Sequence, residues 1–145
     1  MSKFPLGLCS VSFRKRSALE ILKEMQKAEL SIIEWGSDVH APCHQKEVLK
    51  ELSEMQKAFG VSPSSYGTYF KLGVHDTAEL HGYIAAAKLL GTDILRLWCG
   101  TKNSEDYSPE EKADLFEDYF RDTCAISKKD MIAFLRANSS YSLKG

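Results

Sequence analysis

The stretch IIEWGSDVHAP, residues 32–42, places two acids, a tryptophan and a histidine at the end of an apolar run. Glu34 and His40 could bind sugar hydroxyls or support a metal ligand, because carboxylates and imidazoles make directional hydrogen bonds. Trp35 could stack on the apolar face of a sugar ring. An acid near the end of a strand can also serve as a hydrogen-bond anchor for neighbouring loops. Ligand binding and structural anchoring are therefore both open for Glu34.

These side chains need strands and helices to position them, and the chain alternates between the two. Apolar and β-branched runs predict strands at residues 6–13, 31–35, 61–70, 93–100 and 130–135. Apolar residues at helical spacing predict helices at residues 17–30, 44–60, 77–91 and 108–129. The caps agree with these bounds: Ser17 at the first helix, Gly60 and Gly91 after the next two, and Ser108, Pro109 and Glu111 at the fourth.

Regular alternation of strands and helices predicts an α/β fold with a parallel sheet covered by helices. Two architectures fit that pattern. A doubly wound sheet suits the length, whereas a (βα)8 barrel needs about 250 residues and would be only half built in a chain of 145. The phosphate fingerprint GxGxxG is absent from the first strand-helix turn, and GxxxxGK[ST] is absent throughout.

The polar and aromatic residues favour the barrel, in which the chemistry lies at the carboxyl ends of the strands. Those ends carry Ser12 and Arg14; Glu34, Trp35, Asp38 and His40; Tyr66 and Tyr69; and Arg96, Trp98 and Lys102. The turns from helix to strand, at the opposite end of the sheet, carry only residues that end helices or form turns. We therefore expect a partial TIM barrel with about four consecutive parallel βα units, a fifth strand, and strand order 1-2-3-4.

Alternation along the third and fourth strands predicts which side chains face the barrel centre. Tyr66 and Tyr69 are three positions apart, so only one of them should face the centre unless Gly67 breaks the strand. Arg96 and Trp98 should both face the centre. Arg96 is then either a salt-bridged core group or a clamp for substrate.

From these patterns we select Glu34, His40, Tyr66 and Trp98 as the candidate substrate-binding residues. They should converge on one open concavity at the carboxyl ends of the strands. No catalytic residue can be assigned, and Lys102 is expected to be a solvated loop charge.

Composition limits the classes of partner. A net charge of −1, with basic and acidic residues interspersed, offers no basic stripe, so no nucleic-acid partner is expected. No apolar run approaches the roughly 20 residues that a transmembrane helix needs, so no membrane partner is expected. The four cysteines lie far apart and follow no signal peptide, which predicts reduced thiols and a cytoplasmic protein.

A zinc site is suggested by Cys43 and His44, which follow closely on His40. A structural zinc site normally needs two close pairs of ligands, and the second pair is missing. The sequence therefore predicts no metal site. The remaining cysteines are expected to be small hydrophobic residues.

Three motifs resemble the sugar phosphate isomerase/epimerase family of xylose isomerase-like TIM barrels. They are IEWGSDVHAP at residues 33–42, SSYGTYFKLG at residues 64–73 and LGTDILRLWCGTKNS at residues 90–104. The resemblance covers essentially the whole chain and matches the first half of the family's barrel. It implies an enzyme that uses a divalent metal (manganese, magnesium, cobalt or zinc) to move a proton between adjacent carbons of a sugar or polyol, and it places His40 at the rim.

The fifth strand departs from that family. Relatives carry there a glutamate that is the first metal ligand and a catalytic base, and this chain has Leu135 in its place. The other ligands belong to strands six to eight. We therefore expect residues 1–145 to be the N-terminal half of the barrel, as a truncation, a frameshifted product or a gene fragment, with residues 130–145 as a divergent tail. We expect the chain alone to bind no metal and to be inactive.

A half barrel leaves strand edges open. A homodimer or a complementing C-terminal half would close them. Two other functions stay open: a non-catalytic sugar-binding or dimeric assembly module, and an abasic-site endonuclease-like barrel fragment. The lack of basic clusters argues against the nuclease.

Overall fold

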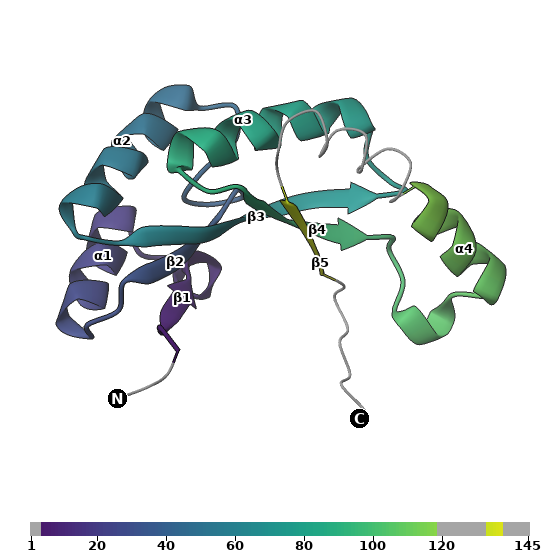
Figure 1. Ribbon diagram of the computed structural model, residues 1–145, viewed down its shortest axis with the longest axis horizontal. Helices are drawn as coiled ribbons and strands as arrows, with labels where there is room; N and C mark the ends of the chain where they lie inside the picture. Colours follow the sequence, from purple (N-terminus) through teal and green to yellow (C-terminus); the bar gives the residue numbers. More distant parts are fainter. Residues whose placement is uncertain (1–3, 119–132, 138–145) are drawn as a thin grey trace.

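The computed structural model describes residues 4–118 and 133–137. Parallel strands form one sheet in the order β1-β2-β3-β4-β5 (Figure 1). The strands are β1 Gly7–Cys9, β2 Ile32–Gly36, β3 Ser62–Leu72, β4 Ile94–Cys99 and β5 Ala133–Ala137. This consecutive order confirms the predicted partial barrel, because a doubly wound sheet reverses its strand order at a switch point.

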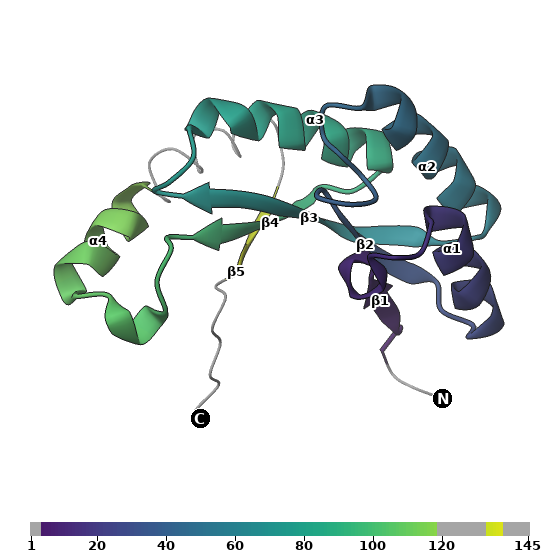
Figure 2. The same cartoon turned by 180° about the vertical axis from the view of Figure 1, so that it is seen from behind.

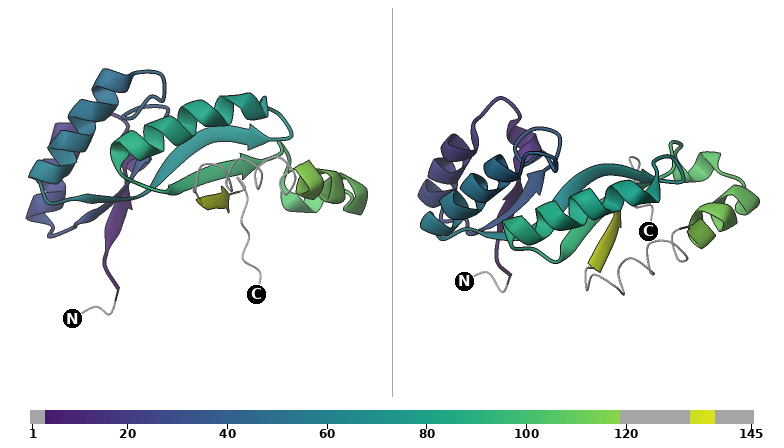
Figure 3. Two further views of the ribbon diagram at one scale, coloured as in Figure 1. Left: turned by 45° about the horizontal axis from the view of Figure 1, so that its top comes forward. Right: turned by 90° about the horizontal axis from the view of Figure 1, so that it is seen from above.

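Helices follow the first four strands. They are α1 Ala18–Lys27, α2 Lys46–Ala58, α3 Leu80–Leu90 and α4 Pro109–Asp118, with short 3-10 turns η1 Ser10–Phe13, η2 Thr77–Glu79 and η3 Ser104–Asp106. Helices α1, α2 and α3 lie on one face of the sheet (Figures 1 and 2), and α2 packs beside α3 (Figure 3). Helix α4 lies beyond the carboxyl ends of β3 and β4 (Figure 1). The predicted helical residues 119–129, and residues 130–132 and 138–145 of the predicted tail, fall outside the described residues.

The helix ends follow the predicted signals. Ser17 and Glu20 form a complete capping box at α1. The backbone N–H of Ser108 donates to Glu111 (2.8 Å) and that of Glu111 donates to the Ser108 hydroxyl (3.2 Å), which confirms the predicted capping box at α4. Gly91 ends α3 in the left-handed conformation, with φ 90°.

The first strand is shorter than predicted. Of residues 6–13, Gly7–Cys9 pair with β2, and Ser10–Phe13 form η1 instead. The Ser10 hydroxyl accepts a hydrogen bond from the backbone N–H of Gly36 at 3.0 Å. This side-chain bond to the end of β2 replaces a strand pairing, so the chain turns away from the sheet at Ser10.

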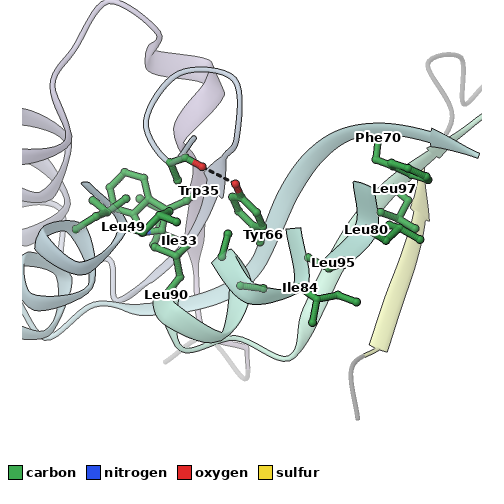
Figure 4. Close-up of a cluster of buried hydrophobic side chains, with 14 of the residues drawn as sticks. Ile33, Trp35, Leu49, Tyr66, Phe70, Leu80, Ile84, Leu90, Leu95 and Leu97 are labelled. Carbon is green, nitrogen blue, oxygen red and sulfur yellow. Dashed lines mark hydrogen bonds between the residues drawn. The ribbon is translucent and has the colours of Figure 1, made fainter. Parts of the chain in front are cut away.

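The hydrophobic core lies between the sheet and helices α1 to α3 (Figure 4). From the sheet it takes the alternate residues Ile33 and Trp35, Tyr66 and Phe70, and Leu95 and Leu97, and from the helices residues such as Leu49, Leu80, Ile84 and Leu90. Residues at the positions in between face the other side of the sheet. Within residues 4–118 and 133–137, the helices are too short or too polar to cross a lipid bilayer.

Gln56 is a polar link inside this core and is 1% exposed. Its Oε1 accepts from the indole N–H of Trp35 at 2.8 Å, and its Nε2 donates to the Leu90 carbonyl at 2.6 Å. One side chain thereby joins α2 to β2 and to the end of α3.

We predict that Gln56→Ala lowers the free energy of unfolding by about 2 kcal/mol, because it leaves two buried polar groups without partners. Urea denaturation followed by circular dichroism measures this. The matched control is Gln26→Ala on the exposed face of α1, which should change stability by less than about 0.5 kcal/mol. Equal effects of the two variants would show that the hydrogen bonds of Gln56 do not contribute to the free energy of unfolding.

Candidate functional site

The candidate site lies on the inner face of the sheet, which we define as the face opposite α1, α2 and α3. Its centre is an ion pair between Glu34 on β2 and Arg96 on β4. Nε of Arg96 lies 3.0 Å from both carboxylate oxygens of Glu34, and Nη2 lies 2.8 Å from Oε1. The two side chains are only 14% and 22% exposed.

Two further groups hold the Glu34 carboxylate. The Cys9 thiol on β1 donates to Oε1 at 3.0 Å, and the Ser65 hydroxyl on β3 donates to Oε2 at 2.7 Å. Glu34 therefore bonds to side chains from all three of the strands β1, β3 and β4. This is the anchoring role left open by the sequence, and Arg96 is salt-bridged as one of its two interpretations predicted.

Gly67 allows the ion pair to pass over β3. A methyl group at this position would lie 2.8 Å from Nη2 of Arg96 and 3.1 Å from Oε1 of Glu34. A side chain there would therefore compete with the guanidinium for the same space.

The electrostatics keep this pair charged. Burial acts to raise the pKa of Glu34, but hydrogen bonds from Arg96, Cys9 and Ser65 and the charge of Arg96 outweigh it and lower the pKa. Burial and the neighbouring Glu34 raise the pKa of the Cys9 thiol. Glu34 is thus an anion at neutral pH and Cys9 remains a thiol.

Aromatic residues continue the site toward the carboxyl ends of the strands. The Arg96 guanidinium lies 5.6 Å from the ring centroid of Trp98, whose indole N–H donates to the Thr68 carbonyl at 3.1 Å. Tyr69 lies beside Trp98, with ring centroids 6.2 Å apart. The Tyr69 hydroxyl accepts from Arg14 at 2.5 Å.

Arg14 also pairs with Asp38 in the loop after β2. Contacts thus run without a break from Asp38 through Arg14, Tyr69, Trp98 and Arg96 to Glu34. The inner face offers aromatic rings next to fixed charged donors and acceptors, an arrangement suited to binding a polar ring compound.

The predicted convergence of four residues is wrong for two of them. Glu34 and Trp98 lie on the inner face, but Tyr66 faces the helices, is fully buried, and donates to the Ala41 carbonyl at 2.5 Å (Figure 4). Burial strongly raises the pKa of its hydroxyl. Tyr69 takes the inner position, so only one of the two tyrosines faces the centre, as alternation predicted.

His40 is the second exception. Its Nδ1 lies 3.1 Å from the Ser10 hydroxyl and its Nε2 lies 2.9 Å from the Arg16 carbonyl. The ring is 8% exposed and packs near Trp35. His40 therefore joins the loop after β2 to the segment after β1, and it does not point into the inner face beside Glu34.

The described residues do not fit the divalent metal that the family resemblance implies. They contain no group of three or more His, Cys, Asp or Glu side chains that could hold a metal ion. Both Glu34 oxygens are occupied by donors, and the adjacent Arg96 cation repels a divalent ion. Lys102, expected as a solvated charge, is exposed and pairs with Glu111 at 2.6 Å.

Comparisons of structure with known proteins agree with the half barrel, and the comparisons of sequence add one relative. No protein-family model matches the chain. The chain is 31% identical over 100 residues to a phosphosulfolactate synthase from Methanothermobacter thermautotrophicus, a match that covers 66% of this chain and 36% of that protein.

Several solved structures share the fold, including the following two. The probable 3-DHS dehydratase AsbF involved in petrobactin synthesis, from Bacillus anthracis, has a TM-score of 0.73 at 18% identity, over 92% of this chain and 52% of its own. A xylose isomerase domain containing protein from Salmonella typhimurium has a TM-score of 0.68 at 12% identity, over 94% and 50%. The chain spans about half the length of these structures. It has the fold of half of a xylose isomerase-like TIM barrel.

We predict that a double-mutant cycle with Glu34→Gln and Arg96→Met gives a coupling energy of about 1–3 kcal/mol, because either single change leaves a buried charge without its partner. Urea denaturation of the unmodified chain, the two single variants and the double variant measures this coupling energy. The exposed pair Glu24 and Lys27, changed to Gln and Met, should couple by less than about 0.5 kcal/mol. A Glu34–Arg96 coupling as small as this control would refute the central pair.

We further predict that Gly67→Ala destabilises the protein by roughly 1 kcal/mol, since the new methyl displaces a guanidinium that is held in place. The penalty should shrink in an Arg96→Met background. Gly82→Ala in α3 is the control: its Cβ meets nothing within 4 Å, and it should stabilise the helix by about 0.5–1 kcal/mol. Thermal or urea denaturation measures both. If the Gly67→Ala penalty persists in the Arg96→Met background, displacement of the guanidinium is not its cause.

Proposed function

We propose that this chain is the polyol-binding, N-terminal half of a sugar isomerase/epimerase-like barrel, in which the groups that transfer protons come from outside residues 1–145. The observation that carries the proposal is the inner face, where Glu34 and Arg96 adjoin the rings of Trp98 and Tyr69. A sugar ring can lie on the aromatic rings while its hydroxyls bond to the charged groups.

Glu34 is poorly suited to remove a proton from carbon. Effective general bases have pKa values near the working pH, whereas the pKa of Glu34 is lowered and its charge is neutralised by Arg96. In this proposal Glu34 acts through Arg96, whose guanidinium it holds on the inner face. The base and the divalent metal belong to strands that complete the barrel.

Leu135 supports the assignment of the base and the metal to other strands. It lies on β5 and is the backbone partner of Arg96 on β4, close to where the resemblance implies a metal-binding glutamate. A hydrocarbon side chain supplies neither a metal ligand nor a base. A complementing C-terminal half, or a second copy of the chain, would have to cover the inner face.

A second candidate follows from the relative at 31% identity. By this reading the whole protein would be a phosphosulfolactate synthase, and the inner face would hold part of that product. Assays of sugar epimerisation and of phosphosulfolactate formation, run on the chain with and without a complementing half, separate the two candidates.

We predict that the purified chain shows no manganese- or cobalt-dependent epimerisation of ketoses and no stoichiometric tight metal site by calorimetry. It should bind ketoses weakly, and Trp98→Ala should weaken that binding, because the ring loses its stacking surface. Phe4→Ala, at a side chain that is 77% exposed, is the aromatic control and should leave binding unchanged.

Light scattering after size-exclusion chromatography should accompany these assays, so that a homodimer is detected if it forms. A one-to-one manganese isotherm of micromolar affinity, abolished by Glu34→Gln or His40→Ala, would overturn the proposal. It would mean that the N-terminal half builds its own metal site.

A further inference from the structure

A small pocket opens at the carboxyl ends of β3 and β4. Its volume is about 220 Å³, and it is lined by Tyr69, Lys71, Trp98, Cys99, Gly100 and Thr101. Whole-ligand sites usually measure about 300–1,000 Å³. The pocket therefore suits one substituent of a ligand better than an entire substrate.

Lys71 gives this pocket its charge. It is the backbone partner of Trp98 across β3 and β4 and lies two residues after Tyr69, so it shares the inner face with both. The other cations of this region are paired: Arg14 with Asp38, Arg96 with Glu34, and Lys102 with Glu111. Within the part of the chain that the structure describes, no ion pair is formed by Lys71, and the pocket lining contains no carboxylate.

The wall of the pocket is fixed before any ligand arrives. The Gly100 N–H donates to the Leu72 carbonyl at 3.0 Å. The Tyr107 hydroxyl accepts from the N–H groups of Thr101 and Lys102 at 2.7 and 3.1 Å. Gly100 has φ 67°, and a Cβ there would lie 2.0 Å from the Tyr107 oxygen. These hydrogen bonds hold the loop in place without a ligand, which reduces the entropic cost of binding.

Another cavity of the described residues serves as a contrast. It lies between β1 and α1, has a volume of about 250 Å³, and is lined in part by Arg16, Glu20 and Glu24. Arg16 is already paired with Glu20, and Glu24 with Lys27, so the lining of this cavity offers no unpaired cation. The Lys71 pocket instead combines an unneutralised cation with two aromatic rings.

We infer that the Lys71 pocket is an anion-binding subsite that takes a phosphate, sulfonate or carboxylate group of a small cyclic ligand whose ring lies against Trp98 and Tyr69. This inference rests on the proposed function, because it names the substrate class of the same inner face. Lys71 supplies a charge-assisted hydrogen bond to the anion. Neutral sugars lack a group for that cation and should bind less tightly.

The test is a fluorescence titration of the full chain with glucose 6-phosphate, glucuronate and glucose. Trp98 lines the pocket and Trp35 is fully buried on the helix side, so Trp98→Phe should abolish the ligand-dependent signal. We expect at least one of the two anions to bind about tenfold more tightly than glucose. Which anion binds identifies the preferred group.

Variants at Lys71 decide whether this cation is responsible. Lys71→Met should reduce anion affinity about tenfold, to the level of glucose, and Lys71→Arg should retain most of it. Lys50→Met, which removes the same charge from the exposed face of α2, should have no effect. Far-ultraviolet circular dichroism verifies that each variant is folded.

Two outcomes would overturn the subsite. If glucose binds as tightly as both anions, or if Lys50→Met weakens anion binding as much as Lys71→Met, the subsite is wrong while polyol binding to the inner face stands. If none of the three probes alters Trp98 emission and calorimetry detects no binding, the proposed function fails together with the subsite.

Discussion

The Glu34–Arg96 ion pair is the interaction on which the inner face depends. Removing two charges from water costs several kcal/mol for each ion, and here the cost is offset by bonds that leave neither carboxylate oxygen without a donor. The pair spans β2 to β4 and passes over β3 at Gly67. It therefore fixes the spacing of three neighbouring strands on the face of the sheet opposite α1, α2 and α3.

The ion pair also decides what the site can do. Arg96 lies over Trp98, so the pair holds the aromatic rings beside it in place. Because Glu34 is already neutralised by Arg96, it is not available as a free base. Lys71, at the outer end of the same surface, adds the one property that the central pair cannot supply, an available positive charge.

Much of this fold could be predicted from local signals. Strand order follows from the repeated βα pattern, and the α4 cap follows from the spacing of Ser108 and Glu111. Alternation with Leu95 and Leu97 placed Arg96 and Trp98 on the inner face. The selection of Tyr66 rather than Tyr69 for the inner face is wrong. The sequence does not show which of the two alternating sets of β3 side chains faces the helices. The place of His40 depends on Ser10, 30 residues away, and on the Arg16 carbonyl, 24 residues away, and nothing near His40 indicates either contact.

The most direct test of this account is the pKa of Glu34 in the folded chain, measured by NMR titration of its ¹³C-labelled side-chain carboxyl. The account predicts a value below the ordinary glutamate pKa of about 4.3, and a rise when Arg96 is replaced by methionine, since burial then acts without the opposing charge. A Glu34 pKa at or above the ordinary value in the unmodified chain would contradict it. Burial alone would then govern Glu34, and the ion pair would not organise the inner face.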